Sequence, residues 1–93
     1  MQLARFLNSV FKNGGFILRD AYLKDYIIGN PNSNPIILKI LNKKLHYKLL
    51  FQPDLYFGEA YTNGDIVIEN GSVSDFLDLA LMNFGRNDLN LFS

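Results

Sequence analysis

The segment Gly29 to Pro35 constrains the fold most strongly, because its sequence Gly-Asn-Pro-Asn-Ser-Asn-Pro is dense in residues that favour turns and resist regular structure. Strand-like sequence lies on both sides of this loop. Before it, residues 16–19 and 22–28 are rich in aromatic and branched side chains with only two residues between them, which predicts a tight hairpin. After it, residues 35–41 are nearly continuous in apolar side chains, which predicts a third strand at the centre of a sheet.

A fourth strand is predicted at residues 65–69, which are mostly apolar and lie between the Asn-Gly pairs at 63–64 and 70–71. Because Asn-Gly pairs favour tight turns, they set both ends of this strand. The preceding residues 54–64 are rich in aromatic side chains. We expect them to form an irregular segment.

Helices are predicted around these strands from apolar side chains at helical spacing and from capping residues. Residues 2–12 carry one apolar stripe, and we expect this helix to dock on its own domain's sheet rather than to lie on a bilayer. A second helix is expected from residue 43 to about residue 51, ended by Pro53. The last helix follows Ser72, and Asp75 at the third helical position completes a capping box.

Size and composition argue against a complete enzyme. The 93 residues, 48% hydrophobic, can bury one core, whereas a nucleotide-dependent α/β enzyme needs several βαβ units of roughly 30 residues each. No G-x-G-x-x-G element opens a helix, there is no cysteine, and His46 is the only histidine. We therefore expect no catalytic residue, no metal site and no bound cofactor in this chain.

Charge is unevenly distributed along the chain. Residues 1–53 hold eight basic and two acidic side chains, and residues 54–93 hold one basic and seven acidic. This asymmetry suggests a basic face for an anionic partner, although the two halves could also neutralise each other across the fold. A sequence pI near 6.5 and the lack of an RNP-like motif argue against nucleic acid. The candidate contacts for anionic lipid, which could equally form an ordinary solvated helix face, are Lys39, Lys43, Lys44 and Lys48.

Residues 53–65 carry a recognisable motif, Gly-Glu-Ala-Tyr-Thr-Asn-Gly at positions 58–64. This stretch resembles the Gly-Glu-Ala/Ser-Tyr-x-x-Gly segment in the N-terminal domain of cyclopropane-fatty-acyl-phospholipid synthases. The family often has methionine and aspartate where this chain has Thr62 and Asn63. The order of predicted elements also matches from residue 15 to residue 84, so the resemblance covers most of the chain.

The resemblance implies an α+β fold of the sterol-carrier type, with a small mixed or antiparallel sheet and helices packed on one side. It implies that residues 1–84 form a lipid-positioning domain and that residues 85–93 begin a linker to an absent C-terminal methyltransferase domain. The parent enzyme would transfer a methylene unit from S-adenosylmethionine to an acyl chain of a membrane phospholipid. The expected location is cytoplasmic, peripheral to the inner face of the membrane. Both a monomer and an oligomer are compatible with the resemblance.

The resemblance also marks motif residues as candidates for docking the catalytic domain or lining the route of the acyl chain. These residues are Gly58, Glu59, Tyr61 and Gly64. Their alternative roles are structural: the Glu59 carboxylate would accept hydrogen bonds from turn amides, Tyr61 would pack in the core, and the glycines would serve backbone geometry. For the whole chain, the alternative functions are a free-standing acyl-chain carrier and a protein-interaction module without lipid affinity.

Overall fold

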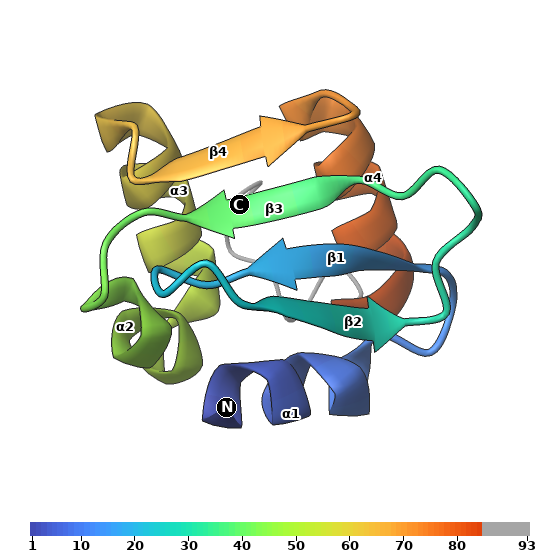
Figure 1. Ribbon diagram of the computed structural model, residues 1–93, viewed down its shortest axis with the longest axis horizontal. Helices are drawn as coiled ribbons and strands as arrows, with labels where there is room; N and C mark the ends of the chain where they lie inside the picture. Colours follow the sequence, from blue (N-terminus) through green and yellow to red (C-terminus); the bar gives the residue numbers. More distant parts are fainter. Residues whose placement is uncertain (85–93) are drawn as a thin grey trace.

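The computed structural model describes residues 1–84, so the predicted linker at residues 85–93 lies outside the described residues. The described chain forms four helices and four strands (Figure 1). In order these are α1 (Gln2–Val10), β1 (Gly15–Arg19), β2 (Asp25–Gly29), β3 (Ile37–Ile40), α2 (Leu45–Phe51), α3 (Pro53–Asn63), β4 (Ile66–Glu69) and α4 (Val73–Phe84).

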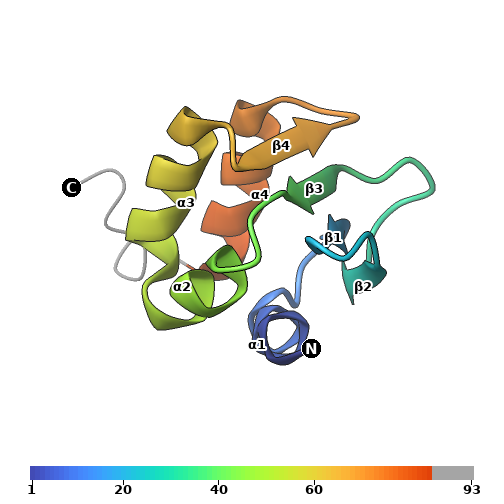
Figure 2. The same ribbon diagram turned by 60° about the vertical axis from the view of Figure 1, so that its left-hand side comes forward.

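The four strands form one mixed sheet in the order β2-β1-β3-β4. β1 pairs antiparallel with β2 and parallel with β3, and β3 pairs antiparallel with β4. Figure 2 shows the helices gathered on one side of this sheet. The α+β class with helices packed on one side is therefore confirmed, as is the central position of the strand after the proline-rich loop; the sterol-carrier type of fold stays a prediction.

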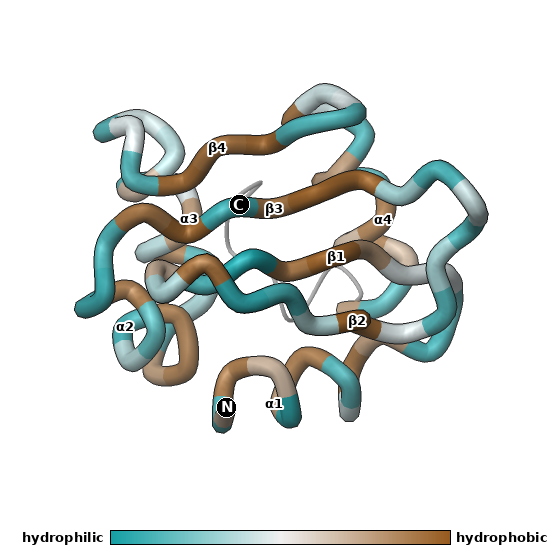
Figure 3. The backbone as a smooth tube through the Cα atoms, viewed as in Figure 1, coloured by the Kyte–Doolittle hydropathy of each residue, from teal (hydrophilic) through white to brown (hydrophobic). Residues whose placement is uncertain are grey.

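The core lies between the sheet and the helices. Because side chains alternate across a strand, β1 and β3 bury every second residue against the helices, and these are Phe16, Leu18, Leu38 and Ile40. Figure 3 shows the hydrophobic stretches of these strands and of β4, with polar residues in the connecting loops. From the helices, the core receives Leu3, Ala4, Leu45, Leu49, Ala60, Phe76 and Ala80.

Within residues 1–84, no helix covers the other face of the sheet (Figure 2). A cross-strand row of Ile27, Ile17 and Ile37 lies on this face. Ion pairs lie beside the row: the Arg19 Nε to Asp25 Oδ1 distance is 2.7 Å, and Lys39 Nζ lies 3.1 Å from Glu69 Oε2. The Lys39 pair joins the basic and acidic halves of the chain, whereas the Arg19 pair lies within the basic half.

The prediction of an irregular segment at residues 54–64 was wrong, because Pro53 to Asn63 form α3. Pro53 is the first residue of this helix, a position where its fixed φ and missing N–H are tolerated. It therefore starts α3 as well as ending the helix before it. The apolar residues Leu55, Tyr56 and Phe57 are consecutive, so they do not produce the stripe by which an amphipathic helix is recognised.

Other predicted boundaries were also displaced, including the start of β3, which lies at Ile37 rather than at residue 35. The second strand of the hairpin begins at Asp25 instead of residue 22, because residues 20–24 form the connecting turn. The second helix begins at Leu45 rather than at residue 43, and α1 ends at Val10 rather than at residue 12. The expectation that α1 docks on its own domain is confirmed, since Leu3 and Ala4 are buried in the core.

Candidate lipid-contact site

One side of α2 is exposed and carries two cations and two aromatic rings. We call Lys44, Tyr47, Lys48 and Phe51 the outer face of α2, because their i, i+3, i+4, i+7 spacing places them on one side of a helix. The Tyr47 and Phe51 side chains are 73% and 76% exposed. Leu55, in the first turn of α3, is also 50% exposed. The opposite side of α2 is buried through Leu45, His46 and Leu49.

The outer face of α2 is positively charged. α2 itself contains no acidic residue, and Lys43 and Lys44 directly precede it. Within residues 1–84, none of Lys43, Lys44 and Lys48 forms an ion pair. Lys48 Nζ instead lies 5.3 Å from the ring centroid of Tyr56, close enough for a cation–π contact.

Lys39 does not belong to this group. Its side chain projects from β3 onto the uncovered face of the sheet and is paired with Glu69. The structure therefore brings together three of the four lysines that the sequence grouped, and places Lys39 on a different surface. The sequence did not separate Lys39 from the other three lysines, because it lies only four residues before Lys43. Between these two positions the chain leaves a strand and approaches a helix.

The β1–β2 turn (residues 20–24) lies beside α2, at the same end of the sheet (Figure 1). The buried Asp20 carboxylate holds the turn, because its Oδ1 accepts hydrogen bonds of 2.9 Å from the backbone N–H groups of Tyr22 and Lys24. The buried His46 of α2 accepts a 3.1 Å hydrogen bond at Nε2 from the N–H of Ala21. The turn is thereby fixed against the helix.

An open cleft of about 530 Å³ lies between the β1–β2 turn, the start of α1 and α2. We call it the turn cleft. Its lining residues are Met1, Gln2, Leu3, Asp20, Tyr22, Tyr26, Lys43, Lys44, His46, Tyr47 and Leu50. The volume lies within the roughly 300–1,000 Å³ typical of small-molecule sites.

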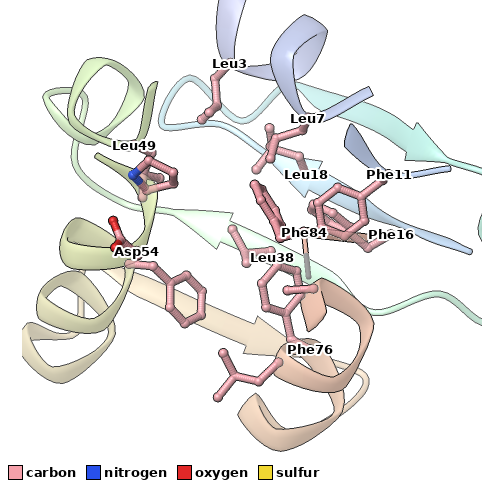
Figure 4. Close-up of a pocket in the computed structure, with 14 residues that line it drawn as sticks. Leu3, Leu7, Phe11, Phe16, Leu18, Leu38, Leu49, Asp54, Phe76 and Phe84 are labelled. Atoms are coloured by element: carbon pink, nitrogen blue, oxygen red, sulfur yellow. The ribbon is translucent and has the colours of Figure 1, made fainter. Parts of the chain in front are cut away.

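A second, apolar pocket of about 70 Å³ lies between the sheet and the helices and is partly open (Figure 4). Figure 4 shows the rings of Phe11, Phe16, Phe76 and Phe84 around it, with Asp54 at its edge. At roughly 30 Å³ per molecule, this volume corresponds to two or three waters. It is far smaller than a pocket that encloses most of a drug-sized ligand.

The motif residues lie on α3 and at its end. Gly58 is inside the helix, and Gly64 ends it in the left-handed conformation with φ of 80°, as the structural interpretation of this glycine expected. Tyr61 is 42% exposed, and its ring stacks on that of Phe57 with 6.4 Å between the ring centroids. The Glu59 side chain is exposed and has no hydrogen-bond partner within residues 1–84, so the turn-amide interaction is not observed. Because two residues are separated by about 200° around a helix, Glu59 and Tyr61 point in different directions.

Sequence reasoning missed the two exposed aromatic residues of α2. Tyr47 and Phe51 fit the same helical spacing as Lys44 and Lys48, so the pattern was present in the sequence. An aromatic side chain in a short helix, however, is normally assigned to the core. Only the burial of the opposite side of α2 identifies these two rings as surface residues.

Comparison of this chain with protein-family models, with curated proteins and with solved structures gives no match. Within residues 1–84, no helix combines the length and apolar character that crossing a bilayer requires. The same residues contain no group of three or more side chains placed to hold a metal ion. The function of this chain is therefore inferred from its exposed residues and their chemistry.

Proposed function

We propose that this chain is the non-catalytic N-terminal domain of a cyclopropane-fatty-acyl-phospholipid synthase-like enzyme, and that it contacts the membrane through the outer face of α2. It would position phospholipid acyl chains for methylene transfer from S-adenosylmethionine by a C-terminal domain. The observation that carries the proposal is the exposure of Tyr47 and Phe51 on the same side of α2 as Lys44 and Lys48. The resemblance of the motif at residues 58–64 supports the choice of enzyme family.

The composition of the outer face of α2 suits the boundary between headgroups and acyl chains. Tyrosine and phenylalanine lose unfavourable contact with water there, and lysine keeps its ammonium group among the lipid phosphates. Each lysine near an anionic leaflet contributes about 1 kcal/mol, and a buried phenylalanine about 1.5–3 kcal/mol. Together these residues supply a reversible attachment, which agrees with a peripheral protein at the anionic inner face of the cytoplasmic membrane.

The small apolar pocket favours a positioning role over a free-standing carrier. A carrier must enclose a long acyl chain, whereas the pocket of about 70 Å³ is far smaller than the roughly 300–1,000 Å³ of typical ligand sites. In the proposed role, the acyl chain stays in the bilayer or in the catalytic domain. The exposed side chain of Tyr61 would then face the C-terminal methyltransferase domain of the parent, whereas Glu59 points to another side of α3.

Vesicle co-sedimentation of residues 1–93 tests the proposal. We expect binding to an equal mixture of phosphatidylglycerol and phosphatidylcholine, and loss of that binding with phosphatidylcholine alone or at high salt. The double variant Lys44→Glu/Lys48→Glu and the single variant Phe51→Ser should each weaken binding by about tenfold or more. Lys12→Glu and Met82→Ser are the matched controls, because both residues are exposed and lie outside α2.

The other outcomes identify the alternative functions. A stoichiometric fatty acid extracted from the purified protein would favour the free-standing carrier. Retention of vesicle binding in the α2 variants, with loss in the controls, would place the contact elsewhere on the molecule. Failure to bind any vesicle would overturn the lipid proposal and leave the protein-interaction module.

A further inference from the structure

We infer that the turn cleft binds the phosphate group of an anionic phospholipid headgroup. The inference rests on the proposed function, because it assigns to one lipid phosphate a specific site beside the outer face of α2. It adds a stoichiometric, saturable contact to a membrane attachment that would otherwise be non-specific.

Lys43 and Lys44 line the turn cleft, and the ammonium groups of Lys43 and Lys24 lie over two of its aromatic rings. Lys43 Nζ lies 4.8 Å from the ring centroid of Tyr22, and Lys24 Nζ lies 5.3 Å from that of Tyr26. Both tyrosines and Lys43 line the cleft, as does Lys44. Cation–π contacts of this kind hold flexible lysine side chains near one position, which reduces the conformational entropy lost when an anion binds.

Two acceptor atoms of residues that line the cleft, Asp20 Oδ1 and His46 Nε2, are already engaged. Asp20 is the only carboxylate among the described residues that line the cleft, and two backbone N–H groups donate to its Oδ1. His46 Nε2 accepts the Ala21 N–H. The groups that remain for a ligand are mainly donors, namely lysine ammonium groups and tyrosine hydroxyls, and this combination is complementary to phosphate oxygens.

The turn cleft is continuous with the proposed membrane surface. Lys44 and Tyr47 line the cleft and also belong to the outer face of α2. A phospholipid whose acyl chains lie against Phe51 therefore has its headgroup on the side of the cleft. This continuity selects a lipid phosphate over a soluble phosphate ester as the ligand.

The test is an amide chemical-shift titration of the full chain at constant ionic strength with three probes. These are inorganic phosphate, sn-glycerol 3-phosphate, and dihexanoyl-phosphatidylglycerol below its micellar concentration. We expect saturable shifts at Ala21, Tyr22 and Lys43 to Tyr47 for every probe, with the tightest binding for the lipid. Equal or tighter binding of sn-glycerol 3-phosphate would assign the cleft to a soluble phosphate ester and overturn the lipid assignment.

Lys43 and Lys48 provide a matched pair of variants. Lys43 lines the cleft and is not on the outer face of α2, whereas Lys48 is on that face and does not line the cleft. Lys43→Gln should weaken phosphate-probe binding by about tenfold, the effect of removing one charge-assisted hydrogen bond. Lys48→Gln should leave the binding of inorganic phosphate and of sn-glycerol 3-phosphate unchanged and weaken vesicle binding.

The two variants separate failure of this inference from failure of the proposed function. Vesicle binding without saturable probe shifts would overturn the cleft site and leave membrane contact intact. Saturable probe shifts without vesicle binding would overturn membrane contact and, with it, the assignment of the phosphate to a lipid. Shifts that rise linearly with phosphate, or that are equal in Lys43→Gln and the unmodified chain, would also overturn the site.

Discussion

The backbone N–H of Ala21 donates a hydrogen bond of 3.1 Å to Nε2 of His46. This bond joins the β1–β2 turn to α2 across 25 residues of sequence. Because Nε2 accepts, the neutral imidazole carries its proton on Nδ1. The only histidine of the chain is therefore a structural residue, and it sets the shape of the turn cleft.

Replacing His46 with phenylalanine should destabilise the fold and loosen the turn. The substitution keeps an aromatic ring in the buried position but leaves the Ala21 N–H without its acceptor, at a cost of about 1–3 kcal/mol. Urea denaturation measures the loss, and hydrogen exchange at Ala21 locates it. Tyr47→Phe is the control on the same helix, because Tyr47 is 73% exposed. Unchanged protection of the Ala21 amide in His46→Phe would contradict the assignment.

Much of the sheet could be predicted from sequence because local signals agree with the final packing. The turn residues between Gly29 and Pro35, and the Asn-Gly pairs around β4, place the strand ends with little influence from the rest of the fold. The capping box also forms as predicted: Ser72 N–H donates to Asp75 Oδ2 at 2.9 Å, and Asp75 N–H donates to Ser72 Oγ at 3.1 Å.

The site could be predicted only in part, because its geometry comes from contacts between distant segments. The Asp20 turn extends as far as Lys24 because one carboxylate oxygen accepts from two amides, and the aromatic side chain of Tyr22 in the turn conceals this signal. Likewise, the burial of Leu45 and Leu49 leaves Tyr47 and Phe51 in solvent. Neither result follows from residue spacing alone. The length of the turn depends on the hydrogen bonds of Asp20, and the exposure of the two rings depends on which side of α2 meets the core.

Asn8 should protect the edge strand β2 from pairing with another chain. Its Nδ2 donates to the Ile27 carbonyl at 3.2 Å, and its Oδ1 accepts from the Gly29 N–H at 2.8 Å, as a neighbouring strand would. Asn8→Leu frees both groups on an edge strand, so we expect about 1 kcal/mol lower stability and increased self-association with concentration. Analytical ultracentrifugation measures the association. Arg5→Ala, on an exposed position of the same helix, should associate no more than the unmodified chain.

Stability should fall with acid at and below about pH 4, the range in which unperturbed aspartates titrate. Hydrogen bonds from the Ser72 backbone and side chain lower the pKa of Asp75, and Arg19 lowers the pKa of Asp25 mainly through their side-chain hydrogen bond. Because the folded pKa of each of these carboxyl groups lies below its unfolded value, the contribution of the carboxylate to stability is fully present above the unfolded pKa. It is lost as pH falls through the folded pKa.

Ser72→Ala isolates the capping-box part of this effect. Without the side-chain hydrogen bond, the pKa of Asp75 should rise toward its ordinary value, which NMR titration of the Asp75 carboxyl measures. Ser74→Ala is the control, because Ser74 is exposed and lies in the same helical turn. An unchanged Asp75 titration in Ser72→Ala would show that the backbone amide alone controls that pKa.

Leu23→Asn should stabilise the protein. Leu23 has φ of 67° in the β1–β2 turn, a left-handed conformation that costs a residue with a Cβ roughly 1–2 kcal/mol and that asparagine adopts more readily. Asn70, the other non-glycine residue with positive φ in residues 1–84, already has this side chain. The Leu23 side chain is 81% exposed, so little apolar contact is lost on substitution.

We expect the free energy of unfolding in urea to rise by about 1 kcal/mol, whereas Leu41→Asn, at an exposed position with ordinary φ, should not raise it. A decrease in stability for Leu23→Asn would mean that the leucine makes a stabilising contact in the folded protein that outweighs its unfavourable backbone.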